Sequence, residues 1–234
     1  MSGGALPGSG LLQAGFQLLG LEGGFLCSNF HPIEKRGLCP SLVYSDLGFE
    51  ILGDVIAKVS GQSFEAYAQE HIFAPLGMQH TSFMVRDIPP ELLATPHKFG
   101  PKVNSYYPYS RQHAPSSHLL SNVDDMNRFA LAQLNRGQLE GIRILPATAY
   151  EEMWGTTCAL NITTPPDTGY GLGWGIGELA GHRMIDHGGL DIGFHSEFLM
   201  APDEGLSVII MANRDYETWD LQIQVMQWLL EARG

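Results

Sequence analysis

Residues 182–213, HRMIDHGGLDIGFHSEFLMAPDEGLSVIIMAN, decide the fold class. Here and just upstream, apolar residues recur with a period of two, which predicts strands. The predicted strands cover 170–177, 182–187, 193–201 and 206–213. Pro202-Asp203-Glu204-Gly205 joins the last two, and these residue types favour a tight turn. We therefore predict an antiparallel hairpin within a sheet of neighbouring strands.

Helical patterns surround the strands. Predicted helices cover 47–60, 64–73, 124–134, 147–154 and about 217–232. In the first of these, Leu47, Ile51, Leu52, Val55 and Val59 recur at helical spacing. Helices followed by adjacent strands and a closing helix predict the α+β class, an antiparallel sheet flanked by helices.

Polar residues suggest where these helices begin. Asp46 is predicted to cap the first helix, Ser63 the second, and Ser121 with Asp124 to form a capping box before the third. Pro146 suits the first turn of the helix over 147–154.

Composition narrows the function classes. The 234 residues are 44% hydrophobic, typical of a globular protein, and the net charge of −12 argues against nucleic acid or an anionic membrane as a partner. Three cysteines have neither metal nor redox spacing, so we predict reduced thiols. We also predict no metal and no cofactor. The N-terminus lacks the basic start of a signal peptide, which predicts a cytoplasmic protein if this N-terminus is native.

In two regions the apolar residues recur at neither helical nor strand spacing. Residues 1–43 are rich in glycine and are predicted to form an arm before a folded domain over 44–234. Residues 85–120 form a long, aromatic and proline-punctuated connection, a type that often covers a binding cleft. Within it, Tyr106-Tyr107-Pro108-Tyr109 suits either a cleft wall or loop packing.

Several motifs in order carry a family resemblance. They are YSDLGFEILGDVIAKVSGQSFEAYAQEHIFAPLGMQHTSF (44–83), LLSNVDDMNRFALAQLNRG (119–137), GYGLGWGIG (169–177), HGGLDIGFHSEF (187–198) and APDEGLSVIIMANRD (201–215). Over about residues 43–232 the chain resembles the β-lactamase-related serine hydrolases. That family includes class C β-lactamases, D-alanyl-D-alanine carboxypeptidases, D-aminopeptidases and family VIII esterases. The resemblance implies a penicillin-binding-protein-like fold with a helical lobe.

The resemblance also implies site residues. Tyr44 takes the place of the family's proton-relay tyrosine, and Asp46 stands where the family has Asn. His187-Gly188-Gly189 matches the third motif, which lies on a strand beside the substrate. The backbone N–H of Leu190 would supply half of an oxyanion hole. Tyr44, at a helix entrance, and His187, at a strand end, should then line one cleft.

The family's nucleophile motif, Ser-x-x-Lys, is absent from the sequence. None of the four lysines, Lys35, Lys58, Lys98 and Lys102, has a serine three residues before it. Without that lysine, Tyr44 should remain a neutral phenol. The resemblance therefore implies an N-terminally truncated serine hydrolase homologue, of the esterase, β-lactamase or D-peptidase type, with its covalent chemistry in doubt.

Other interpretations stay open. The chain can be a non-catalytic binding module that keeps the cleft, or a fragment of a longer active enzyme. Either form would bind a small ester, a peptide or a β-lactam-like ligand, and an open strand edge favours a homo-oligomer. Taken alone, Tyr44 suits a packed core position and His187 the end of a strand. The remaining histidines considered, His113, His118, His182 and His195, are predicted at surface or cleft positions because their spacings fit no zinc pattern.

Overall fold

An antiparallel sheet organises the chain. The computed structural model describes residues 44–97, 113–155, 158–159, 167–214 and 218–233. Six strands follow one another across the sheet in chain order: β3 (Cys158–Ala159), β4 (Asp167–Tyr170), β5 (Gly175–Leu179), β6 (His182–Asp191), β7 (Phe194–Ala201) and β8 (Leu206–Ala212). β8 is one edge of this sheet as described. The predicted α+β class and the β7–β8 hairpin are confirmed.

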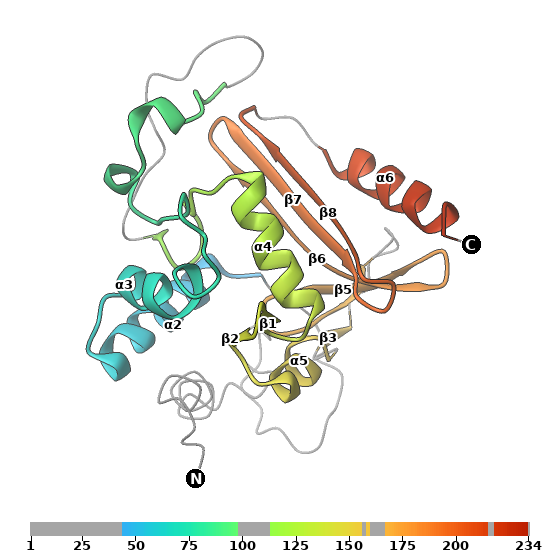
Figure 1. Cartoon of the computed structure of the whole chain (residues 1–234), viewed down its shortest axis with the longest axis horizontal. Coiled ribbons are helices and arrows are strands. Elements are labelled where there is room, and N and C mark those ends of the chain that lie inside the picture. Colours follow the sequence, from blue (N-terminus) through green and yellow to red (C-terminus); the bar gives the residue numbers. More distant parts are fainter. Residues whose placement is uncertain (1–43, 98–112, 156–157, 160–166, 215–217, 234) are drawn as a thin grey trace.

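Helices lie on both sides of the sheet and in a lobe beside it (Figure 1). The helical elements are α2 (Asp46–Ser60), α3 (Phe64–Ala68), a π-helical turn (Gln69–Phe73), two 3-10 turns (Val85–Asp87 and Pro90–Leu92), α4 (Val123–Leu134), α5 (Ala147–Met153) and α6 (Trp219–Glu231). A short hairpin of β1 (Gln138–Leu139) and β2 (Ile142–Arg143) follows α4. The lobe consists of α2 and α3.

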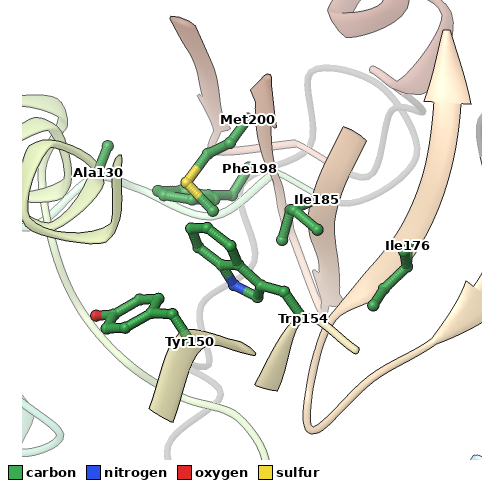
Figure 2. Packing of buried hydrophobic residues seen from close by; sticks show 7 residues of the cluster. All are labelled: Ala130, Tyr150, Trp154, Ile176, Ile185, Phe198 and Met200. Carbon is green, nitrogen blue, oxygen red and sulfur yellow. The ribbon is translucent and has the colours of Figure 1, made fainter. Parts of the chain in front are cut away.

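Both faces of the sheet are buried, because side chains along a strand alternate between faces. Phe198 and Met200 of β7 point into a cluster with Ala130 of α4 and Trp154 after α5 (Figure 2). Leu199, the residue between them, belongs to the cluster that α6 covers on the opposite face. The site residues of β6 therefore lie in a sheet that is fixed from both sides.

The apolar stripe of α2 is more exposed than its pattern suggests. Gly53 is the only fully buried residue of the helix. Leu47 is 68% exposed, and Ile51 and Val59 are 38% and 41% exposed. The other two members of the stripe, Leu52 and Val55, are partly buried.

Two predicted helix starts are wrong by one residue. Ser45, not Asp46, caps α2, and its hydroxyl accepts a hydrogen bond from the Gly48 N–H at 3.2 Å. Asn122, not Ser121, caps α4 by accepting from the Asp125 N–H at 2.8 Å. Side chains one position apart compete for the same free N–H groups, and the backbone conformation decides between them. The predicted Ser63 cap is confirmed.

The predicted strand over 170–177 is divided by a turn. β4 ends at Tyr170, and the Gly171 N–H donates to the Trp174 carbonyl at 2.8 Å before β5 begins. A Cβ on Gly171 would lie 2.1 Å from the Met153 carbonyl oxygen, so this close approach requires glycine.

Two predicted regions, 1–43 and 106–109, lie outside the described residues. Within the described part of the chain, no helix has the length and apolarity of a membrane span.

Candidate active site

Tyr44 lies at the entrance of α2, directly before the Ser45 cap. Its ring is 6.3 Å from Phe49, one turn into the helix, and 6.4 Å from Tyr170 in an edge-to-face arrangement, between ring centroids. Tyr44 is 48% exposed as a residue, so the alternative of a packed core tyrosine is wrong.

His187 faces Tyr44 from the sheet. Their ring centroids are 6.4 Å apart, so α2 and β6 bring the two residues together as predicted. His187 is not at a strand end, however, because β6 continues through both glycines to Asp191. It pairs with Phe198 of β7, and cross-strand partners share a face, so its side chain lies on the α4 side of the sheet.

The two glycines after His187 have close neighbours on β7. A Cβ on Gly188 would lie 2.8 Å from the Glu197 Oε2, and one on Gly189 would lie 3.0 Å from the Ser196 Oγ. Packing alone thus disfavours larger residues here. The same glycines leave the strand backbone uncovered, and Leu190 beyond them is 71% exposed.

The phenol of Tyr44 is neutral. Partial burial of the ring raises the pKa of Tyr44 above its ordinary value of 10.0, and the negative charge of Asp46 raises it further. Lys58 is the only lysine among the described residues, and it lies about 20 Å along α2, in an ion pair with Asp54. Among the described residues, no charge lowers the pKa of Tyr44, so this phenol is not suited to act as a base near neutral pH.

Replacing Asp46 by Asn should lower the pKa of Tyr44, because it removes the nearest negative charge. The pKa should stay above its ordinary value, because burial persists. Ultraviolet titration of tyrosinate, as a difference against the same protein carrying Tyr44→Phe, isolates this one phenol. Asp54→Asn, on the same helix but away from the ring, is the control. An unchanged Tyr44 titration in Asp46→Asn would contradict this electrostatic account.

A buried histidine–carboxylate pair lies on the opposite face from His187. The His195 Nε2 is 2.8 Å from the Glu197 Oε1, and the two side chains are 9% and 4% exposed. The predicted surface or cleft position of His195 is therefore wrong. Glu197 pairs with Gly188, and its second oxygen has no hydrogen-bond partner among the described residues. His195 and Glu197 are two positions apart, so in a strand they lie on the same face. The sequence does not show whether that face is buried.

Burial raises the pKa of Glu197, and this outweighs the lowering effect of His195. A carboxyl whose pKa is raised on folding stabilises the fold below its unfolded pKa, about 4.5, and that contribution is lost as the pH rises through the folded pKa. Glu197→Gln should therefore flatten the pH dependence of the unfolding free energy above about pH 4.5. The difference in unfolding free energy between Glu197→Gln and the wild type should therefore move in favour of the variant as the pH rises.

Urea unfolding of Glu197→Gln at about pH 5 and about pH 8 tests this dependence. Glu178→Gln, at an exposed position of β5, is the control. A loss of stability in Glu197→Gln mainly at the higher pH would show that burial does not raise the pKa of this carboxyl.

Comparison with known proteins assigns the family. The family profile described as Beta-lactamase matches residues 41–232. The chain belongs to the beta-lactamase family. This assignment agrees with the motif order and with the convergence of Tyr44 and His187.

Individual relatives of this family are distant in sequence. The unguisins hydrolase ungD' of Aspergillus campestris is 26% identical over 184 residues, which cover 75% of this chain and 34% of that protein. A putative D-alanyl-D-alanine carboxypeptidase of Escherichia coli O157:H7 is 22% identical over 206 residues, covering 74% and 45%. The chain thus spans less than half the length of these curated relatives.

A solved structure supports the fold. The octameric penicillin-binding protein homologue from Pyrococcus abyssi superposes with a TM-score of 0.70 at 22% identity, covering 81% of this chain and 43% of that one. The predicted penicillin-binding-protein-like fold is confirmed.

Proposed function

We propose that this chain carries the ligand-binding half of a serine hydrolase site for ester or amide compounds. The observation that supports this most is the approach of Tyr44 and His187 to 6.4 Å from two different elements, in a chain of the beta-lactamase family. Sequence spacing alone gives no reason for these residues to meet, since 143 positions separate them along the chain (187 − 44).

Each residue has a role in this proposal. His187 donates a hydrogen bond to a ligand carboxylate or carbonyl, a role that suits imidazole near neutral pH. Gly188 and Gly189 let an extended ligand approach the strand backbone closely. The Leu190 N–H donates to the carbonyl oxygen, and Tyr44 donates from its neutral phenol at the other side of the ligand. Asp46 adds negative charge beside Tyr44.

Covalent catalysis needs more than these groups. A serine hydroxyl is a weak nucleophile and requires a positioned base, and oxyanion donors accelerate a reaction only when a nucleophile attacks. The printed sequence has no Ser-x-x-Lys, and Tyr44 is a neutral phenol. We therefore propose that these 234 residues bind their ligand without forming an acyl-enzyme.

Acyl-D-amino acid peptides are the first ligands to test. One relative is named a putative D-alanyl-D-alanine carboxypeptidase and another an unguisins hydrolase. A ligand with a terminal carboxylate and a nearby carbonyl matches a histidine beside strand N–H donors. Small esters and β-lactams share that carbonyl and are the second choice.

Two measurements separate binding from catalysis. Incubation with a serine-reactive fluorophosphonate should give no labelled protein, and hydrolysis of p-nitrophenyl butyrate should equal the rate in buffer. Labelling that disappears on a single Ser→Ala change would overturn the non-covalent part of the proposal and identify the nucleophile. A genomic sequence upstream that encodes Ser-x-x-Lys would instead identify the chain as part of an active enzyme.

Self-association is a further part of the proposal. β8 is an edge of the described sheet, and exposed edge strands pair readily with other chains. The Pyrococcus abyssi neighbour is described as octameric. We propose that this chain also forms a homo-oligomer, which sedimentation of the purified protein measures.

A further inference from the structure

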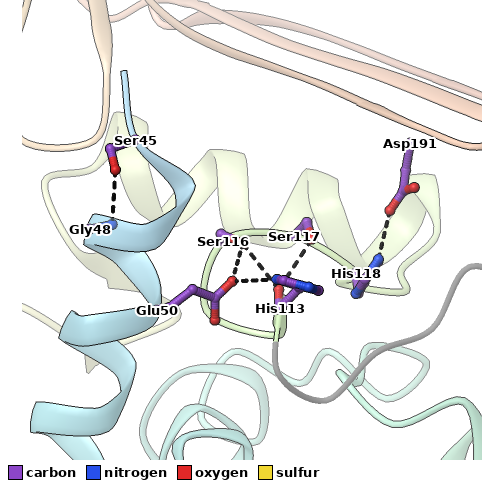
Figure 3. A network of polar contacts seen from close by, with 8 residues as sticks. All are labelled: Ser45, Gly48, Glu50, His113, Ser116, Ser117, His118 and Asp191. Carbon is purple, nitrogen blue, oxygen red and sulfur yellow. Dashed lines mark hydrogen bonds and ion pairs between the residues drawn. The ribbon is translucent and has the colours of Figure 1, made fainter. Parts of the chain in front are cut away.

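The segment 113–120 connects the two elements that carry the proposed site (Figure 3). At one end, the Glu50 Oε1 of α2 lies 3.1 Å from the His113 Nδ1 and accepts a hydrogen bond from the Ser116 Oγ at 2.6 Å. At the other end, the His118 Nε2 lies 2.8 Å from the Asp191 Oδ2. Glu50 belongs to the helix that Tyr44 precedes, and Asp191 follows Leu190 directly.

His118 has an unusual backbone conformation. Its φ is +64°, in the left-handed region that favours glycine. The other non-glycine residues with positive φ in the described chain are Arg136, Glu140 and Ala180. Each of those three precedes a glycine with positive φ, as in tight turns. His118 precedes Leu119 instead, and it directly follows the turn in which the Ser117 N–H donates to the His113 carbonyl at 2.8 Å. A residue in the left-handed region commonly ends such a turn, and histidine tolerates this region better than most residues.

From this position the side chain of His118 reaches Asp191. It is 11% exposed and the side chain of Asp191 is 32% exposed, so their contact is partly shielded from solvent. The Asp191 Oδ1 accepts from the Ile192 N–H at 2.6 Å. One carboxylate thus joins His118 to the tip of the β6–β7 hairpin, whose last pair is Asp191 with Phe194.

We propose that His118 is a positioning residue for ligand binding. Acting through Asp191, it fixes the end of β6 so that the Leu190 N–H is held toward the ligand carbonyl. Glu50 holds the other end of the segment. The segment therefore fixes the position of the hairpin tip relative to α2, the helix that Tyr44 precedes. This inference rests on the proposed function of the site that Tyr44, His187 and the end of β6 form.

The variant His118→Gly tests it, because glycine adopts the same φ without the imidazole. Ala180→Gly is the matched control: it changes a residue with φ of +52° in the β5–β6 turn, remote from the site. His118→Asn, which also tolerates positive φ, is a second variant in case the glycine protein folds poorly. Thermal melting shows that each variant is folded.

The readouts are amide hydrogen exchange at residues 190–194 and the Kd for N-acetyl-D-alanyl-D-alanine, both by NMR. In His118→Gly, exchange should rise and the Kd should rise about tenfold, because small displacements of a donor weaken binding steeply. Ala180→Gly should leave both unchanged. Asp191→Asn should weaken binding similarly, and the double variant should bind no worse than either single one.

Each other outcome decides a different point. An unchanged Kd in His118→Gly, with or without faster exchange, overturns the positioning role in binding. Additive effects of the two substitutions overturn the route through Asp191. If the wild-type protein does not bind the dipeptide, the proposed function fails, and hydrogen exchange alone decides whether His118 positions the hairpin tip.

Discussion

Replacing Trp154 by alanine is expected to destabilise the fold by about 3–5 kcal/mol, the usual cost of removing a large aromatic side chain from a core. Trp154 is 1% exposed, and it stacks edge-to-face on Tyr150 with ring centroids 5.0 Å apart. The guanidinium of Arg136 lies 5.0 Å from the centre of its ring. The hydrophobic cluster around Trp154 joins α4 and α5 to one face of the sheet (Figure 2). His187 lies on the same face.

Two tryptophan variants sharpen this prediction. The Trp154 Nε1 has no hydrogen-bond partner among the described residues, so Trp154→Phe loses packing but no hydrogen bond. It should cost clearly less, about 1–2 kcal/mol. Trp228→Ala, at a position 62% exposed on α6, should cost less than about 0.5 kcal/mol. Urea unfolding followed by circular dichroism measures all three, and equal losses at Trp154 and Trp228 would contradict the described core.

Replacing His187 by alanine is expected to weaken binding of N-acetyl-D-alanyl-D-alanine by tenfold or more. A hydrogen bond to a charged group contributes about 1.5–3 kcal/mol, and each 1.4 kcal/mol is a factor of about ten in Kd. Calorimetric titration of the wild type and the variant gives this ratio directly.

His182→Ala is the matched control for this change. His182 begins the same strand, about 17 Å from His187, and contacts Glu204 instead of the site. Its removal should leave the Kd unchanged. If both variants bind as the wild type does, His187 is not a ligand-binding residue.

Local sequence patterns predicted most of the fold. The hairpin around Pro202–Gly205 and the helix after Pro146 needed only neighbouring residues, because turn chemistry and helix periodicity are local. The start of α4 was off by one residue, since Asn122 and Ser121 both suit a cap and only backbone geometry separates them. The exposed stripe of α2 was not predictable from its pattern, because periodicity marks an apolar face without showing what covers it.

Predicting the candidate site required information beyond local sequence patterns. The approach of Tyr44 to His187 was predicted from the family's motif order, not from any local pattern. The pairs His195–Glu197 and His118–Asp191 were missed. The first lies two positions apart on one strand, and its burial depends on what packs against that face of the sheet. The second joins residues that are far apart along the chain, and such contacts leave no periodic signal in one sequence.

We propose that the edge of β6 beside Tyr44 binds the carbonyl of an acyl-D-amino acid. An NMR titration of the wild-type protein with N-acetyl-D-alanyl-D-alanine tests this binding. We expect saturable shifts of the Leu190 amide and of the His187 and Tyr44 side chains, with the dipeptide recovered intact. Saturable shifts confined to other parts of the chain, or none at all, would show that this edge does not bind the ligand.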